Sequence, residues 1–201
     1  MTFHKPFTYS RDILPLQTLD LTEHYLIAMP AMADPRFAKT LTYVCEHNAQ
    51  GALGVIVNKP IDMNLQSLLK QIHIDFASDR CKSLPVHYGG PVQADRGFIL
   101  HKPSGQWQSS LKVGEEVGLT TSKDILEAVA KDEGPENLLV CLGHAGWGPG
   151  QLEQEMAQNA WLSVRADPHL LFSLPANERY EAAFRLLGIN FAMLSDEAGH
   201  A

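Results

Sequence analysis

Residues 137–155 read NLLVCLGHAGWGPGQLEQE, and this stretch decides the fold. The nearly continuous apolar run 137–142 predicts a strand at the centre of a sheet. The glycine-rich run 143–150 follows it and predicts a turn. Pro149 suits the first position of a helix, because the N–H group that proline lacks would have no partner there. A strand, a glycine-rich turn and a helix start therefore form the predicted centre of an α/β-mixed domain.

The glycine-rich turn allows two interpretations. A turn of this kind at a helix N-terminus is a generic anion site. However, the sequence lacks the Lys-Ser/Thr pair of a P-loop and the spacing Gly-x-Gly-x-x-Gly, and the charge of Glu153 would compete with a phosphate. We favour the structural interpretation, in which the glycines permit close helix–sheet packing and Trp147 fills the core. The turn contributes these candidate residues for a pocket wall: Gly146, Trp147, Gln151 and Glu153.

The rest of the chain mixes strands with helices. Short apolar or alternating runs bounded by turn residues predict strands at 25–29, 40–47, 54–58, 86–90, 97–101, 111–113, 117–120 and 160–164. Apolar residues at helical spacing predict helices that start near Asp62 or Asn64, start at Thr121 or Ser122, and end at Gly188. Turns are expected at 48–51 and 90–95, and a loop at 78–84.

This order of elements predicts an α+β fold with a mixed, largely antiparallel, barrel-like sheet flanked by several helices. Residues 1–20 lack periodicity and are expected to form an extended lead-in. Residues 21–201 are then a single domain, which suits a chain of 201 residues.

The charge balance argues against direct DNA contact. The chain has 16 Lys and Arg against 23 Asp and Glu, so its formal net charge is −7. An acidic surface repels phosphates unless a local basic patch overrides it, and the basic residues here are scattered singly.

Cysteine use and hydropathy indicate a cytoplasmic protein. The three cysteines form no Cys-x-x-Cys pair, and two of them lie inside apolar runs, as buried thiols do. The sequence has no apolar stretch of about 20 residues that could span a bilayer, and no secretory signal peptide is visible at the N-terminus. We therefore expect no membrane segment.

A second polar cluster joins Glu46, His47 and Asn48 to Asn58. His47 at a strand end beside an acid could be a general base or a metal ligand. The alternative, which we favour, is that the first three residues flank a turn and that Asn58 caps the end of a strand.

A third cluster contains Gly89, Gly90, Arg96 and His101. Arg96 near two glycines could clamp a carboxylate or phosphate. It could equally pair with Asp95 in a tight turn, and the sequence does not decide between these interpretations.

No motif indicates a metal, a cofactor or a catalytic nucleophile. The nine histidines form no His-x-His or His-Glu-x-x-His pattern, and the Gly-x-Ser-x-Gly elbow is absent. We therefore expect no metal and no cofactor, and we favour a non-enzymatic protein over an enzyme.

Taken together, the three clusters resemble the AlgH/YqgE family of bacterial proteins. The resemblance rests on several segments in sequence order from about residue 22 to 201: 25–30, 44–48, 54–60, 89–91, 95–101, 121–122, 146–155, 159–162 and 198–201. It implies a compact fold with a barrel-like sheet and a cytosolic bacterial protein. It implies no reaction.

The family carries the label of transcriptional regulator, which derives from an effect on alginate production. No helix-turn-helix or zinc finger is visible that would support direct operator contact. We expect a regulator that acts through a protein partner or a small ligand. The alternative is an enzyme or anion-binding protein with a pocket near residues 146–153. The sequence leaves the partner and the oligomeric state open.

Overall fold

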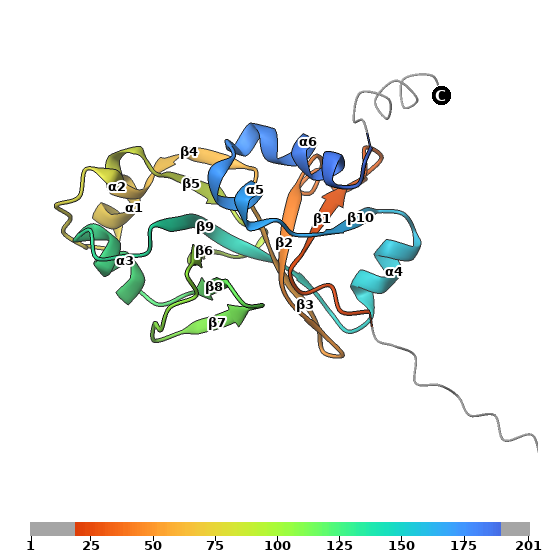
Figure 1. Ribbon diagram of the computed structural model, residues 1–201, viewed down its shortest axis with the longest axis horizontal. Helices are drawn as coiled ribbons and strands as arrows, with labels where there is room; N and C mark the ends of the chain where they lie inside the picture. The colour runs from red at the N-terminus through yellow and green to blue at the C-terminus, as the bar shows by residue number, and fades with distance from the viewer. Residues whose placement is uncertain (1–18, 190–201) are drawn as a thin grey trace, which may run out of the picture.

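A computed structural model describes residues 19–189 of the chain. Most of the predicted lead-in and the end of the chain lie outside this range. The molecule is elongated, with α1, α2 and α3 at one end and α4 at the other, while α5 and α6 cover one face of the sheet (Figure 1).

The elements follow one another in this order: β1 His24–Ala28, β2 Leu41–Asn48, β3 Gly51–Ile56, β4 Pro60–Asn64, α1 Leu65–Gln71, α2 Arg80–Ser83, β5 Pro85–Tyr88, β6 Val92–Lys102, β7 Ser110–Val113, β8 Val117–Thr120, α3 Asp124–Ala130, β9 Asn137–Trp147, α4 Gln151–Ala157, β10 Trp161–Arg165, α5 Pro168–Ser173 and α6 Ala176–Leu186.

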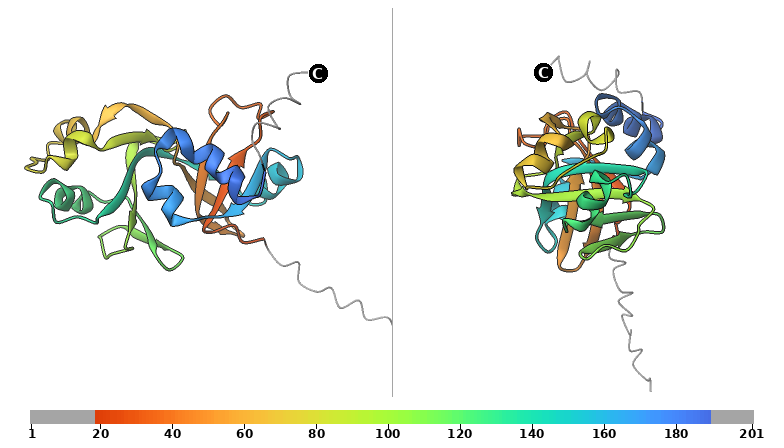
Figure 2. Two further views of the ribbon diagram at one scale, coloured as in Figure 1. Left: turned by 45° about the horizontal axis from the view of Figure 1, so that its top comes forward. Right: turned by 90° about the vertical axis from the view of Figure 1, so that its left-hand side faces the viewer.

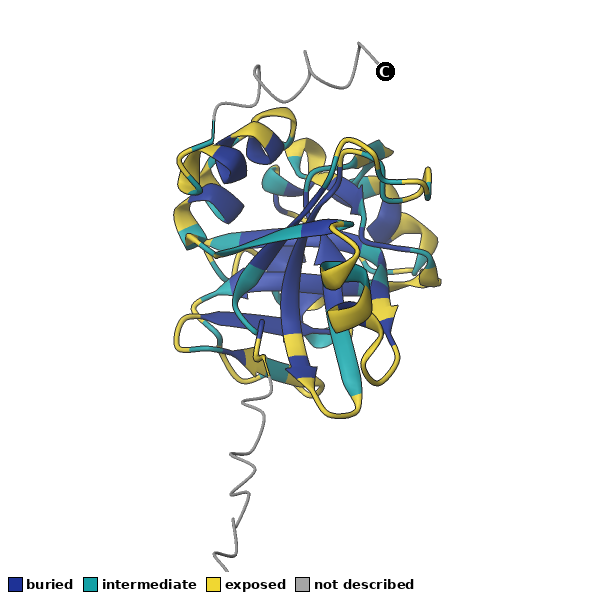
Figure 3. Cartoon of the chain, turned by 90° about the vertical axis from the view of Figure 1, so that its right-hand side faces the viewer, coloured by how far each residue is buried: buried dark blue, intermediate teal, exposed yellow. Residues whose placement is uncertain are grey.

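The strands form one ten-stranded sheet in which the main path runs β10-β1-β2-β3-β9-β6-β8-β7. Strand β5 pairs with β9 in parallel and with β4, and the other pairs are antiparallel. Views from the two ends of the molecule show the sheet curling (Figures 2 and 3), and exposed residues gather at its loops (Figure 3). The predicted mixed, largely antiparallel barrel-like sheet is confirmed.

Strand β9 is longer than predicted and lies at the centre of the sheet. It continues from Asn137 through the glycine-rich run to Trp147 and pairs with β3, β5 and β6. The predicted turn at 143–150 is therefore wrong for its first five residues. The actual turn is 148–150, and α4 begins at Gln151, so Pro149 does not occupy the first helical position. The first helical residue follows Gly150, whose φ of 71° suits glycine.

Close contact between backbones explains why β9 needs glycine without turning. A side chain on Gly89 would collide with the carbonyl oxygen of Gly143, and one on Gly143 would collide with that of Gly90. The glycines thus let the chain before β6 cross β9 at short range. The predicted turn at 90–95 is also wrong, because β6 begins at Val92 and pairs there with His144.

One predicted helix start is confirmed, a second is wrong, and one short helix was not predicted. Asn64 is the N-cap of α1, and its Oδ1 accepts a hydrogen bond from the backbone N–H of Ser67 at 2.9 Å, as expected. Helix α3, by contrast, has Lys123 at its N-cap and no side-chain cap, because the Ser122 hydroxyl donates to Asp124 at 2.5 Å instead. The short helix α2 replaces part of the loop predicted at 78–84.

Three apolar clusters fill the space between the sheet and the helices. One lies under α5 and α6 and includes Phe184, and a second lies under α1 and α3 and includes Leu69. The third contains Trp147, Leu152 and Trp161 under α4. This third cluster places two tryptophans beside the turn that the sequence singled out.

Candidate functional site

A pocket of about 560 Å³ opens beside α4. Four segments form it: the loop between β1 and β2, the start of β6, the end of β9, and α4 with the start of β10. Its lining residues are Ala31, Met32, Ala33, Asp34, Arg36, Phe37, Pro91, Val92, Gly146, Trp147, Gln151, Glu155, Gln158, Asn159, Ala160 and Trp161. We call it the aromatic pocket, because Phe37, Trp147 and Trp161 pack against one another with ring centroids 5.6–6.5 Å apart.

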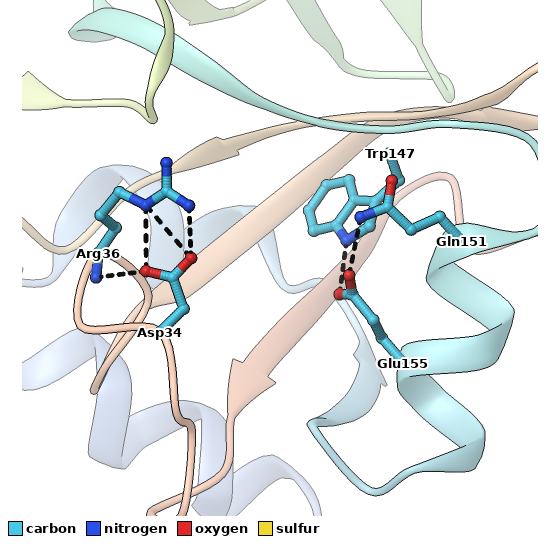
Figure 4. Close-up of polar contacts among 5 residues, drawn as sticks. All are labelled: Asp34, Arg36, Trp147, Gln151 and Glu155. Carbon is cyan, nitrogen blue, oxygen red and sulfur yellow. Dashed lines mark hydrogen bonds and ion pairs between the residues drawn. The ribbon is translucent and has the colours of Figure 1, made fainter.

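The carboxylate of Glu155 holds one wall of the aromatic pocket together. Its Oε2 accepts hydrogen bonds from the indole N–H groups of Trp147 at 2.9 Å and Trp161 at 2.8 Å. Its Oε1 accepts from the side-chain amide of Gln151 at 2.9 Å, one helical turn earlier. The side-chain Oε1 of Gln151 in turn accepts from the backbone N–H of Gly148 at 3.0 Å. These bonds tie α4 to the turn and to both indole rings, and Figure 4 shows those of Glu155 with Trp147 and Gln151.

An ion pair on the loop between β1 and β2 faces this wall (Figure 4). The Arg36 guanidinium donates from Nε and Nη2 to the Asp34 carboxylate, and the shortest of these contacts is 2.6 Å. Hydrogen bonds from Arg36 lower the pKa of Asp34, and Asp34 raises the pKa of Arg36. The Arg36 side chain is 60% exposed, so the pair lies at the mouth of the pocket and not in its floor.

Three of the four residues predicted at the turn line this pocket, namely Gly146, Trp147 and Gln151. Glu153 points elsewhere: its Oε1 lies 3.2 Å from Nε2 of His47. The backbone N–H of Leu21 donates to Nδ1 of His47 at 3.1 Å, so Nδ1 carries no proton and Nε2–H donates to Glu153. His47 therefore joins the end of β2 to α4.

Glu46 and Asn48 lie on the other side of Trp147. They line a shallow hollow of about 290 Å³ that Trp147 also borders. The Asn48 side-chain amide donates to Glu46 at 2.9 Å, and its carbonyl accepts from the backbone N–H of Gln50 at 2.7 Å. Both residues thus organise the hairpin turn between β2 and β3.

Asn58 holds the end of the loop between β1 and β2, which lines the aromatic pocket. Its Oδ1 accepts from the backbone N–H of Leu41 at 2.8 Å, and its Nδ2 donates to the carbonyl oxygen of Lys39 at 2.9 Å. These bonds fix the point where the loop joins β2. Gly89 and Gly90 are buried at the crossing with β9 and reach the pocket only through their neighbour Pro91.

Arg96 and His101 lie away from the aromatic pocket. Arg96 borders a separate cavity between α1 and α3. His101 is buried, and its Nδ1 donates to the carbonyl oxygen of Pro103 at 2.8 Å while Nε2 accepts from the Thr120 hydroxyl at 2.8 Å. Burial lowers the pKa of His101. The structure therefore does not bring the three predicted clusters into one site.

The candidate set drawn from the sequence omitted most of this pocket, because it contained three of the sixteen lining residues. Glu155 and Trp161 were not among the candidates, although the i, i+4 spacing of Gln151 and Glu155 signals a contact on one helix face. The loop residues Asp34, Arg36 and Phe37 have no periodic pattern that could have indicated them. Within residues 19–189, no group of three or more His, Cys, Asp or Glu side chains could hold a metal ion.

The fold and the pocket together define a class of protein. It is an α+β protein whose curled, largely antiparallel half-barrel sheet carries six helices in the part of the chain that the structure describes. The chain belongs to the AlgH-like family, whose sequence model matches residues 25–192.

Relatives and solved structures agree with this assignment. A UPF0301 protein of Nitrosospira multiformis is 58% identical over 92% of this chain and all of its own length, and one of Dechloromonas aromatica is 54% identical over the same shares. The solution structure of the AlgH protein from Pseudomonas aeruginosa, also UPF0301, has a TM-score of 0.76 and 46% identity, covering 98% of this chain and 100% of its own.

A Corynebacterium diphtheriae protein shares the fold at a TM-score of 0.66 and 18% identity, covering 82% of this chain and 86% of its own. In the described part of the chain, no helix combines the length and the apolar character needed to cross a membrane.

Proposed function

We propose that the protein is a regulator that binds a small ligand in the aromatic pocket. The bound ligand then changes how the protein interacts with a protein partner. The observation that carries the proposal is the bonding of Glu155. Its carboxylate already holds Trp147, Trp161 and Gln151 in place. A wall that is fixed before the ligand arrives loses little conformational entropy on binding, which favours affinity.

The size and lining of the pocket support a small ligand. A volume of about 560 Å³ lies within the range of known small-molecule sites. The apolar surface comes from Met32, Phe37 and the two tryptophans, while Gln158 and Asn159 at the end of α4 supply polar groups. We therefore expect a ligand with a planar or apolar body and a few hydrogen-bonding groups.

The loop between β1 and β2 supports a regulatory role. It contributes six residues between Ala31 and Phe37 to the pocket, all in that range except Pro35, and several of them are also exposed on the surface. A ligand that contacts this loop would change the surface that a protein partner meets. Such a partner is more consistent with the net charge of −7 than a nucleic acid is.

The alternative function, an enzyme with its active site near residues 146–153, gains less support from the same pocket. The ionisable residues of its lining are Asp34, Arg36 and Glu155, and each is engaged by another side chain. A general base needs a free acceptor directed at the substrate.

We also propose that the protein is cytoplasmic, because its three cysteines are free and buried.

The test is a thermal-shift screen of the full chain against a library of bacterial metabolites. A ligand that binds the folded state raises Tm, by mass action. A matched pair of variants then locates the site. Gln158 and Gln154 are both exposed glutamines of the α4 segment, but only Gln158 lines the pocket. We expect Gln158→Ala to reduce the shift and Gln154→Ala to preserve it.

Two results would count against the proposal. One is a screen in which no compound raises Tm. The other is a ligand whose shift is the same in the wild type and in Gln158→Ala and Phe37→Ala, since such a ligand would bind elsewhere. An enzyme would instead convert its ligand, so chromatography of the incubated compound distinguishes the two functions.

A further inference from the structure

A second cavity, of about 200 Å³, lies between α1, α3 and strand β6, at the end of the molecule away from α4. Its lining residues are Leu68, Ile72, Asp95, Arg96, Gly97, Ile99, Thr121, Ser122, Lys123, Leu126 and Leu142. We call it the Arg96 slot. It shares no lining residue with the aromatic pocket.

The floor of the slot is apolar. Leu68, Ile99 and Leu126 belong to the buried cluster under α1 and α3, and Ile72 and Leu142 pack against that cluster. The volume is below that of drug-sized ligand sites, which begin at about 300 Å³. The slot therefore suits a compound with a single small apolar group.

Two cationic residues, Arg96 and Lys123, lie at the rim of the slot. Arg96 donates from Nη2 to the Thr121 hydroxyl at 2.9 Å and from Nη1 to the Gln93 side chain at 3.5 Å, and its guanidinium lies 5.9 Å from the centre of the Phe98 ring. Thus Arg96 contacts Thr121 and Gln93 and not its neighbour Asp95. These contacts hold the guanidinium in place and leave part of its five donors free.

The positive charge on the rim is not neutralised by a direct ion pair. Among residues 19–189, neither Arg96 nor Lys123 forms an ion pair with a carboxylate. Asp95 supplies the one acidic group of the lining, so the rim has two cations against one anion. This local excess stands out on a chain with a net charge of −7.

We infer that the Arg96 slot binds a small carboxylate with a single apolar group, the carboxylate at Arg96 and Lys123 and the apolar group on the floor. The guanidinium matches a carboxylate in shape and charge. The floor adds the free energy of removing an apolar group from water. Neither interaction suffices alone. A small anion without an apolar group leaves the apolar floor in contact with water, and a neutral apolar compound forms no ion pair with Arg96 and Lys123.

The test is a titration of the full ¹⁵N-labelled chain followed by NMR, with benzoate, benzyl alcohol and acetate as probes. We expect benzoate to move the amide signals of Gly97, Thr121 and Leu126. Benzyl alcohol and acetate should bind at least about tenfold more weakly, since a charge-assisted hydrogen bond or a buried ring is worth that much. Equal affinity for either control compound, or no shift with benzoate, overturns the inference.

Gly97→Val tests the floor without disturbing the fold. A Cβ on Gly97 would meet only Cδ1 of Ile99, at 3.4 Å, and β-branched residues suit strands. The added side chain would occupy the slot, so benzoate binding should be lost while Tm stays level or rises. Retained binding at a level Tm contradicts the site.

Charge variants test the rim. Arg96→Gln should weaken benzoate binding about tenfold, and Lys123→Gln about threefold, because the lysine adds a more flexible charge. Lys131 provides the matched control, since it is exposed at the other end of the same helix, α3, and lies outside the slot. Lys131→Gln should leave the affinity unchanged. An equal loss in Lys123→Gln and Lys131→Gln would show a non-specific charge effect and refute the assignment.

Discussion

Strand β9 borders two cavities of opposite character. Its C-terminal end meets the aromatic pocket, where the side chains of Glu155 and Asp34 are already bonded to other residues. Its middle, at Leu142, meets the Arg96 slot, where the cations Arg96 and Lys123 have no carboxylate partner within the described chain. Under our two proposals, the first site selects a ligand by the shape of its aromatic wall, and the second selects one by its charge together with a small apolar group.

The largest expected effect separates the two cavities by their role in stability. Trp161 is 2% exposed and bonded to Glu155, so Trp161→Ala should lower the free energy of unfolding, by about 3–5 kcal/mol. Gly97→Val at the slot should change it by less than about 1 kcal/mol, and in the favourable direction. Urea unfolding of both variants measures the difference. Similar losses would break the comparison.

Acid should destabilise the strand that borders both cavities, because His87 lies on β5 and pairs there with Cys141 of β9. Burial, and then the charge of Arg179, lowers the pKa of His87 from 6.5 to about 4. Both ring nitrogens are buried without a hydrogen-bond partner in the described structure. The unfolded chain takes up a proton below about pH 6.5 that the folded chain refuses until about pH 4, so stability is lost as the pH falls through this window.

The loss assigned to His87 is about 3 kcal/mol between pH 7 and pH 4. His87→Leu should remove that part of the dependence, which urea unfolding at several pH values would show. A variant that loses as much stability on acidification as the wild type would exclude His87 as the cause.

A smaller effect is expected where the Glu155 bonds are weakened without removing a ring. In Glu155→Gln, one of the three donors to the carboxylate would face an amide N–H instead of an oxygen. The cost is about 1–3 kcal/mol. Glu153→Gln on the same helix is the control, since its side chain is 43% exposed; this change should cost less than about 1 kcal/mol. Equal costs would mean that Glu155 holds nothing in place.

The smallest effects on stability are expected at the binding residues themselves. Gln158 and Arg96 are exposed, and replacing exposed side chains changes the free energy of unfolding by about 0.5 kcal/mol or less. Gln158→Ala should therefore weaken only the ligand of the aromatic pocket, and Arg96→Gln only the ligand of the Arg96 slot. Both variants should unfold like the wild type. Thermal unfolding of each variant without ligand is the check.

The sequence predicted the strands whose side chains alternate or form apolar runs. Tyr25 to Ala28 and Leu41 to Asn48 fall close to their predicted positions. It failed at the glycines of β9, because glycine marks a turn and a close backbone contact equally well. Only the position of Gly90 against Gly143 distinguishes the two, and that contact is not visible in a single sequence.

The candidate site was predictable on one side only. Trp147 and Gln151 belong to a segment whose strong local pattern of glycines between a strand and a helix is visible in the sequence. Phe37 and Arg36 belong to the loop between β1 and β2, which is irregular. They line the same pocket as Trp147 only because the folded sheet brings this loop to the end of β9. Contacts between residues so far apart in the sequence depend on the topology of the sheet, which the local sequence pattern does not reveal.

The three tryptophans allow the most direct test of the aromatic pocket. Trp147 and Trp161 line it, while Trp107 packs at the other end of the sheet against the cluster under α1 and α3. In an ¹⁵N–¹H spectrum, the indole signals of these residues report separately. Added to the chain, a ligand from the metabolite screen should move the signals of Trp147 and Trp161 and leave that of Trp107 in place. A ligand that moves Trp107 alone, or none of the three, would contradict the proposed function.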